Sequence, residues 1–275
     1  MNISEHSSNF VQEMKRRNFS PQTVENYSSC IKKFFSWSTK DHPKNINESD
    51  IKAFLGQFNE PNTQRGYHSA IKKFYEICLN QKDKFKYIPY ARKSSKLPVV
   101  LSVDEIQSMF NACENLKHKV ILAILYSCGL RVSELINLKW SHIDRSRKII
   151  NIIQAKGAKD RQVMLTDSLI PLLEKYYNKY RPKEYVLNGQ TELQYSDRSV
   201  SEVIKQLAKK AGITKKVHTH LIRHCTFTHQ VEMGTDINLI QKLAGHNNIK
   251  TTLIYTHISH NLISKINSPL QNINL

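Results

Sequence analysis

The chain has 275 residues and a formal net charge of +18, from 41 lysines and arginines against 23 aspartates and glutamates. This length suits two domains of ordinary size, each with its own core, rather than a single barrel. So large a positive excess favours a polyanionic partner over a neutral metabolite, and a generally basic protein is the alternative. Residues 1–92 carry +6 and the remainder +12, so both halves are expected to face the polyanion.

The cysteines and the apolar runs indicate where such a protein works. Five cysteines are widely spaced and mostly set in apolar patterns, which is typical of reduced core thiols. No apolar signal region is present, and the longest apolar run, Val120 to Tyr126, is too short to span a bilayer. We therefore predict a soluble, cytoplasmic protein without a membrane segment.

The first part of the chain has the periodicity of amphipathic helices. Residues 9–36 predict two helices, with Ser20 as N-cap and Pro21 as first residue of the second. Two more helices are expected from Ser49 and from Pro61. The second and fourth helices resemble each other, and each carries an outward lysine pair: Lys32, Lys33, Lys72 and Lys73. These lysines are candidates to lie along a phosphate backbone, unless the similarity is a coincidence of amphipathic design.

A polar stretch, Lys-Ser-Ser-Lys-Leu-Pro, interrupts the pattern and has the composition of an interdomain linker. We therefore predict a helical DNA-binding domain over 1–92, a linker over 93–100 and a second domain over 101–275. The second domain is expected to begin with a helix, because Ser102 and Glu105 have the spacing of a capping box.

An arginine follows the most apolar helix of the chain. Residues 118–128 are apolar nearly all round, which predicts a buried helix, and Gly129 is placed to end it in a left-handed conformation. Arg131 comes directly afterwards and is expected to be held rigidly. The alternative is an ordinary surface ion pair between Arg131 and Glu134.

A basic turn joins two predicted strands, 147–154 and 161–166. Lys156 precedes the glycine of this turn and is the first candidate to reach into a groove; Lys159 is its competitor and a candidate DNA contact. Further along the second domain we predict a helix at 168–181, a short strand at 185–188 and a helix at 196–211.

The stretch 218–257 gathers histidines, one arginine and a lone tyrosine, which indicates phosphate chemistry. His220 and His224 are four residues apart, but no glutamate lies between them as a zinc hydrolase would need. The chain also lacks the Gly-x-Ser-x-Gly elbow of a serine hydrolase and a glycine-rich phosphate loop. We therefore expect neither a metal nor ATP.

The chemistry that remains is attack by Tyr255 on a phosphodiester. Guanidinium groups match phosphate oxygens bidentately and stabilise the extra charge of the pentavalent phosphorane. A lysine can protonate the leaving 5′ oxygen, and cations with a histidine base must activate the phenol. We expect His224 and His229 to form ordinary helix hydrogen bonds and His218 to lie at the surface. His246 is expected to be a cation that faces Tyr255, and a cap on the preceding helix is the alternative.

Four motifs occur in order: Gly-Leu-Arg131-Val-Ser-Glu134-Leu, Lys156-Gly, His220-Leu-Ile-Arg223-His224, and Leu-Ala-Gly-His246 with Tyr255. They resemble the motifs of the tyrosine recombinases, which include the Xer proteins and the phage integrases. The resemblance implies a mainly α fold with a small β-sheet, in which an all-helical SAM-like core-binding domain precedes a mixed α+β catalytic domain. It also implies a catalytic set with Tyr255 as the nucleophile that joins the DNA 3′ phosphate and Glu134 in support: Arg131, Lys156, His220, Arg223, His246 and Tyr255.

The same resemblance implies a clamp on double-stranded DNA, four identical or mixed protomers on paired sites, and strand exchange through a Holliday junction without metal or nucleotide cofactor. Two alternatives stay open: a type IB topoisomerase-like nicking and closing monomer, and a non-catalytic DNA-binding regulator on the same fold. Residues 259–267 predict a short amphipathic helix that docks on its own domain or on a neighbour. No arm-binding domain is visible, which favours an Xer-like recombinase or a short mobile-element integrase.

Overall fold

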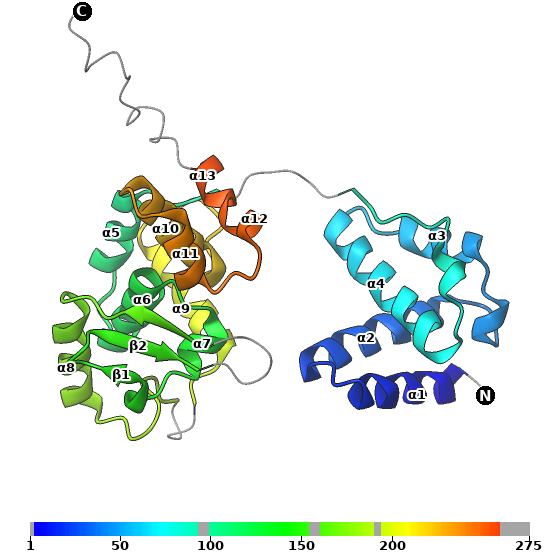
Figure 1. Cartoon of the computed structure of the whole chain (residues 1–275), viewed down its shortest axis with the longest axis horizontal. Coiled ribbons are helices and arrows are strands. Elements are labelled where there is room, and N and C mark those ends of the chain that lie inside the picture. Colours follow the sequence, from blue (N-terminus) through cyan, green and yellow to red (C-terminus); the bar gives the residue numbers. More distant parts are fainter. Residues whose placement is uncertain (1–2, 93–98, 154–159, 190–193, 259–275) are drawn as a thin grey trace, which may run out of the picture. The chain divides into compact units, whose positions relative to one another are not determined.

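The computed structural model describes residues 3–92, 99–153, 160–189 and 194–258 (Figure 1). The chain divides into two compact units, Met1–Lys96 and Leu97–Leu275. Within the described ranges no helix is both long and apolar enough to cross a membrane. The predicted helix at 259–267 and the turn lysines Lys156 and Lys159 lie outside these ranges.

The first unit is helical, as predicted. Its α-helices are α1 (Ile3–Arg16), α2 (Pro21–Trp37), α3 (Glu48–Gly56) and α4 (Pro61–Cys78), and its short 3-10 turns are Pro43–Asn45 and Lys82–Phe85. Ser20 caps α2 by accepting a hydrogen bond from the Thr23 amide at 3.2 Å. The helices α1, α2 and α4 pack on one another around an aromatic core in which Phe10 and Phe35 each meet Phe74 edge to face.

The second unit is also mainly helical. Its helices are α5 (Val103–Asn111), α6 (Leu116–Cys128), α7 (Val132–Ile136), α8 (Leu169–Tyr180), α9 (Asp197–Lys210), α10 (Thr219–Glu232), α11 (Ile237–Ala244), α12 (Ile249–Thr252) and α13 (Ile254–Ile258). The predicted capping box of Ser102 and Glu105 starts α5. Helix α6 is buried between α8 and α10, as its apolar sequence predicted. All five cysteines are free, and three are buried.

A three-stranded antiparallel sheet lies at one side of this unit (Figure 1). Its strands, in sheet order, are β1 (Ile143–Asp144), β2 (Ile149–Ile152) and β3 (Arg161–Met164). The predicted hairpin of β2 and β3 is confirmed, and Ile152 pairs with Arg161 at the end next to the connecting turn. β1 was not predicted, because its two residues are too few to show alternation in the sequence. The predicted fold class, a mainly helical chain with a small sheet, is confirmed.

The predicted strand at 185–188 is wrong. Tyr185 forms an isolated bridge with Lys139, and Asn188 forms another with Gln194. The two ends of residues 185–188 therefore pair with different segments, so no continuous ladder forms. One further backbone bond is present, in which the Val186 amide donates to the Leu138 carbonyl at 2.8 Å.

Gly129 ends α6 with φ +59°, the left-handed conformation predicted for it. A Cβ at this position would lie 2.6 Å from the Phe227 ring, so a larger residue would both strain the backbone and strike α10. The close approach sets α6 directly against α10, and Arg131 therefore emerges beside Arg223.

Candidate active site

Arg131 stands at the N-cap of α7 and is held from two sides. Its backbone amide donates to Oε2 of Glu134 at 2.8 Å, and its Nη1 donates to Oε1 of the same carboxylate at 2.7 Å. Its Nη2 lies 3.5 and 3.4 Å from the carbonyls of Ala244 and Gly245. The side chain is 37% exposed, so its guanidinium is fixed in place and still open to a ligand.

Glu134 is a buried carboxylate, and a surface ion pair with Arg131 is therefore the wrong description. The side chain of Glu134 is 5% exposed, and Arg161 from β3 donates to both of its oxygens at 2.8 Å. Burial alone would raise the pKa of Glu134, but the bonds from Arg161 and from Arg131 outweigh it and hold the pKa at about 2. The carboxylate is ionised at neutral pH and neutralises part of the surrounding positive charge.

Arg223 is the buried arginine of the site, with 1% of its surface exposed. Its Nη1 donates to the carbonyl of Gly129 and its Nη2 to the carbonyl of Ala244, so it joins the ends of α6 and α11. Burial, and next the charge of Arg131, lower the pKa of Arg223 to about 10, which leaves it protonated at neutral pH. Because Arg131 also approaches Ala244, the two arginines meet at one helix end.

His220 and His224 lie one turn apart on α10, edge to face, with ring centroids 4.5 Å apart. His220 is exposed as a residue, but its ring is partly desolvated by neighbouring protein atoms. This desolvation, and next the charge of Arg223, lowers the pKa of His220. His224 was expected to form ordinary hydrogen bonds, which is wrong for its Nδ1: this buried atom has no partner among the described residues. Burial, and then neighbouring positive groups, lower the pKa of His224 to about 4, so its ring is neutral and stays in the apolar cluster.

Two further histidines of the stretch, His218 and His229, have structural roles. His229 bonds the Tyr126 hydroxyl at 2.8 Å and the Leu101 carbonyl at 3.0 Å, as predicted. His218 is exposed, as predicted, and its Nδ1 also caps α10 by accepting from the Leu221 amide at 3.1 Å.

His246 follows α11 and lies between Arg223 and Tyr255. Its Nε2 lies 3.4 Å from Nη2 of Arg223, and its Nδ1 lies 3.0 Å from the Thr252 hydroxyl. Arginine can only donate, so Nε2 accepts and the proton is assigned to Nδ1. Burial, and then the charges of Arg223 and Arg131, lower the pKa of His246 to about 4. The expectation of a cation here is wrong, since the ring is neutral at neutral pH.

Tyr255, on α13, is packed into an aromatic cluster and is 1% exposed. Its ring lies 5.5 Å from Phe227, 5.6 Å from His224 and 6.1 Å from His246, measured between centroids, and is nearly parallel to His246. Burial raises the pKa of Tyr255, and the charges of Arg223 and Arg131 oppose that rise only in part. The phenol is therefore near the cations but not ionised.

The structure brings five of the six predicted catalytic residues into one continuous set of contacts. Neighbouring side chains follow one another in this order: His220, His224, Tyr255, His246 and Arg223. Arg223 and Arg131 are then linked through the Ala244 carbonyl, which both approach. The sixth residue, Lys156, lies outside the described ranges, as does Lys159. Sequence reasoning missed Arg161, because its partners Glu134 and Leu243 lie far from it in the chain.

The predicted lysine pairs of the first unit are not equivalent. Lys32 and Lys33 on α2 are exposed, and Lys33 lies over the Phe58 ring at 5.4 Å from its centroid. Lys72 is partly buried near the Tyr90 ring, and Lys73 pairs with Glu76 at 2.8 Å. A DNA contact by these four lysines stays a prediction.

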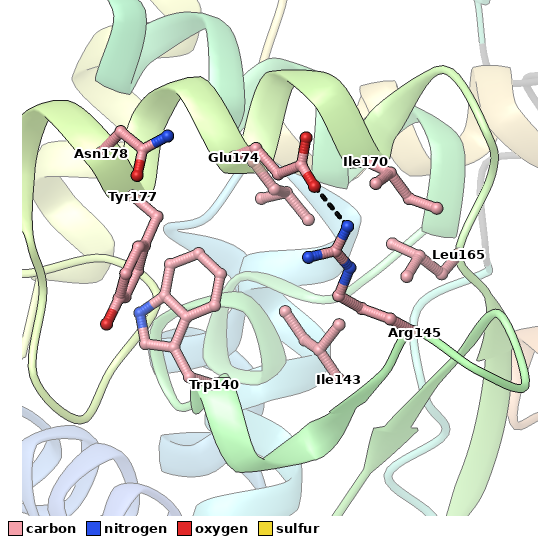
Figure 2. Close-up of a pocket in the computed structure, with 9 residues that line it drawn as sticks. Trp140, Ile143, Arg145, Leu165, Ile170, Glu174, Tyr177 and Asn178 are labelled. Carbon is pink, nitrogen blue, oxygen red and sulfur yellow. Dashed lines mark hydrogen bonds and ion pairs between the residues drawn. The ribbon is translucent and has the colours of Figure 1, made fainter.

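A cavity elsewhere in the second unit shares no residue with this set (Figure 2). It has a volume of about 390 Å³ and lies between α8 and the segment that leads into the sheet. Trp140 packs edge to face on Tyr177 at one end, and Arg145 pairs with Glu174 at the other. The candidate site instead reaches solvent through the partly exposed Arg131 and the exposed His220, which suits a polymeric phosphodiester better than an enclosed metabolite.

Comparison with known proteins agrees with this chemistry. Residues 99–261 match the model of the phage integrase family, and residues 8–84 match that of the N-terminal SAM-like domain of phage integrases. The first match covers more than half of the chain, so the chain belongs to the phage integrase family. It is a tyrosine recombinase, an enzyme of site-specific DNA recombination. Within this family it is Xer-like, and the SAM-like fold expected for the first domain is confirmed.

Individual relatives place the likeness along nearly the whole chain. A tyrosine recombinase of Thermosipho africanus is 32% identical over 260 residues, which cover 88% of this chain and 91% of the relative. Tyrosine recombinase XerD of Oceanobacillus iheyensis is 31% identical over 268 residues, with 88% and 90% covered. The crystal structure of XerA recombinase is 30% identical, with a TM-score of 0.58 and coverage of 95% and 96%. A lambda integrase tetramer bound to a Holliday junction shares the fold, with a TM-score of 0.81 and 18% identity. The match covers 97% of this chain and 80% of the lambda integrase chain.

Proposed function

We propose that this recombinase cleaves DNA by attack of Tyr255 on the scissile phosphate, with Arg131 and Arg223 as the groups that hold the phosphate. The observation that carries this proposal is the meeting of both arginines at the carbonyl of Ala244, with His246 between Arg223 and Tyr255. Guanidinium groups fixed in this way can stabilise the charge that develops on the phosphorane.

The reaction balances with residues of this chain. Tyr255 Oη forms the bond to phosphorus and loses its proton to a neutral histidine, for which the exposed His220 is the candidate. The bond from phosphorus to the 5′ oxygen breaks, and that oxygen takes a proton, for which Lys156 is the candidate. His246, with Nδ1 protonated toward Thr252, positions Arg223. The phosphotyrosine bond conserves the energy of the cleaved phosphodiester, so attack by a 5′ hydroxyl of another strand reseals DNA.

The proposed substrate is double-stranded DNA, bound by a domain of residues 1–92 and a catalytic domain of residues 101–275. Four copies, identical or mixed with a second recombinase, would assemble on two sites; a tetramer on a Holliday junction is the state in which lambda integrase was crystallised. Such a substrate places the protein in the cytoplasm with the chromosome. Because contacts from Lys32 and Lys33 would be largely electrostatic, affinity should fall steeply with salt.

A two-site assay tests recombination against the topoisomerase-like alternative. Footprinting on the DNA that flanks the gene would locate a protected inverted repeat, which would then be placed twice in one supercoiled plasmid. We expect excision or inversion that depends on both sites. Relaxation of a plasmid without any site, by the monomer, would instead favour a nicking and closing enzyme. Specific binding without any strand exchange or covalent adduct would favour a non-catalytic regulator.

The position of the repeat would also separate the two biological roles. A protected site beside the gene is expected for a mobile-element integrase, and a single chromosomal site far from the gene is expected for chromosome dimer resolution.

A further inference from the structure

A buried arginine outside the family motifs, Arg161, joins Glu134 to the end of α11. Arg161 is the first residue of β3, and its side chain is 7% exposed. Its Nη1 and Nη2 donate to the two oxygens of Glu134, each at 2.8 Å, and its Nε donates to the Leu243 carbonyl at 2.7 Å. Protein acceptors therefore occupy all three nitrogens of the guanidinium, which leaves it poorly placed to bind a phosphate.

The carboxylate of Glu134 is shared evenly between two arginines. Oε1 accepts from Nη1 of Arg161 and Nη1 of Arg131, while Oε2 accepts from Nη2 of Arg161 and the backbone amide of Arg131. Bidentate contact with Arg161 fixes the plane of the carboxylate. Since Arg131 bonds the same two oxygens, any rotation of Glu134 would move the exposed guanidinium of Arg131.

The end of α11 is shaped to receive Arg161. Gly245 has φ +62°, and a Cβ built on it would lie 3.1 Å from Cδ of Arg161. The carbonyls at a helix C-terminus lack partners within the helix and attract cations, and here Leu243 accepts from Arg161 while Ala244 accepts from Arg223. His246 follows directly, so Arg161 fixes Arg131 to the helix end that leads to His246.

We propose that Arg161 is a positioning residue of the recombinase: through Glu134 and the Leu243 carbonyl, it holds Arg131 at the angle required by the scissile phosphate. This inference rests on the proposed function, in which Arg131 binds a nonbridging oxygen of that phosphate. Lysine cannot replace the arginine, because it has a single nitrogen and cannot bond both carboxylate oxygens and the carbonyl in one plane.

The test compares Arg161→Lys with wild type on two suicide DNA substrates, one with a normal scissile phosphate and one with a methylphosphonate there. On the normal substrate we expect covalent cleavage to slow roughly 10- to 100-fold, with DNA affinity unchanged, because misplaced groups slow the chemical step. The methylphosphonate lacks one charged oxygen, so the positioning of Arg131 matters less and the defect should shrink. Arg131→Ala should show the same pattern, and the double variant should be no slower than Arg131→Ala alone.

An equal defect on both substrates, or additive defects in the double variant, would overturn the positioning role and indicate general destabilisation. Arg147→Lys is the matched control, since Arg147 is exposed beside the same sheet and should change neither rate. If Arg161→Lys does not fold, Glu134→Gln must give the same substrate-dependent pattern, and a uniform defect there would also contradict the proposal. Absence of any Tyr255-dependent adduct with wild-type protein would instead defeat the proposed function.

Discussion

The site has a cationic corner and an aromatic corner, and the two differ in how closely they match the state needed for the reaction. The cationic corner, made of Arg131, Glu134, Arg161 and Arg223, is held by hydrogen bonds to a buried carboxylate and to helix-end carbonyls. The aromatic corner, made of His224, Phe227, His246 and Tyr255, is packed and apolar, and burial raises the pKa of its phenol. The arginines of the proposed phosphate site are therefore already held in place in the free chain, whereas the proposed nucleophile Tyr255 still has to be ionised.

The largest expected effect separates the two corners completely. Tyr255→Phe should abolish covalent trapping on a suicide substrate and leave DNA affinity unchanged, because only the attacking oxygen is removed. Among the described residues no group bonds the Tyr255 hydroxyl, so the free energy of unfolding should change by less than about 1 kcal/mol. Trapping and urea denaturation check both parts, and persistent trapping would remove Tyr255 from the mechanism.

Arg223→Ala should damage chemistry and folding together. We expect cleavage to fall by about 10³-fold, as for loss of a transition-state donor. The Gly129 carbonyl would lose its buried partner, which costs about 1 to 3 kcal/mol for an unpaired group, and the Ala244 carbonyl would keep only its longer contact with Arg131. Single-turnover cleavage and chemical denaturation measure these losses. Arg145→Ala, which changes an exposed arginine, is the control. An Arg223→Ala variant as stable as wild type would contradict the structural role of the buried Arg223.

Lys156→Ala tests a group that belongs to neither corner. We expect cleavage to slow by about 10²-fold through loss of the general acid. A substrate with a 5′-bridging phosphorothiolate should restore the rate, because its thiolate leaves without a proton. Lys159→Ala is the matched control and should need no rescue. Failure of the rescue, or rescue of Lys159→Ala in its place, would reassign the acid.

The smallest effect is the pH dependence contributed by His246, the residue between the corners. Its pKa of about 4 in the folded chain lies below the ordinary 6.5, so the unfolded chain binds the proton first as the pH falls. The stability from neutral His246 is therefore complete above pH 6.5 and is lost toward pH 4. The low pKa of Glu134 acts below pH 4.5, outside most of this window.

Between pH 7 and pH 5, His246→Gln should lose about 1 kcal/mol less stability than wild type, a value reduced for the partial exposure of the ring. Thermal unfolding at both pH values measures the difference. His224 has a similarly low pKa, so His224→Gln should act in the same direction. Identical slopes for His246→Gln and wild type would mean that His246 is not held neutral.

Local chemistry explains what the sequence could predict here. The left-handed end at Gly129 and the buried helix α6 depend on short-range preferences, so both were predictable. The motif residues up to His246 were also predictable, since each lies in a contiguous family box, and Tyr255 follows nine residues after His246. The proposed roles of these residues remain predictions for experiment.

Long-range contacts explain what the sequence did not reveal. Arg161 meets Glu134 across 27 positions and Leu243 across 82, and no local pattern encodes either bond. The neutral state of His246 depends on burial beside two arginines from other helices. The predicted strand at 185–188 failed because its apolar residues are buried in the second core without a continuous strand partner.

The most direct test of the account is to identify the amino acid that carries the DNA. Wild-type protein would be trapped on a suicide substrate, digested with protease and nuclease, and analysed by tandem mass spectrometry. We predict a nucleotide 3′-phosphate on Tyr255 and on no other residue. An adduct on a different tyrosine, or on a 5′ phosphate, would contradict the central claim that Tyr255 attacks a phosphate held by Arg131 and Arg223.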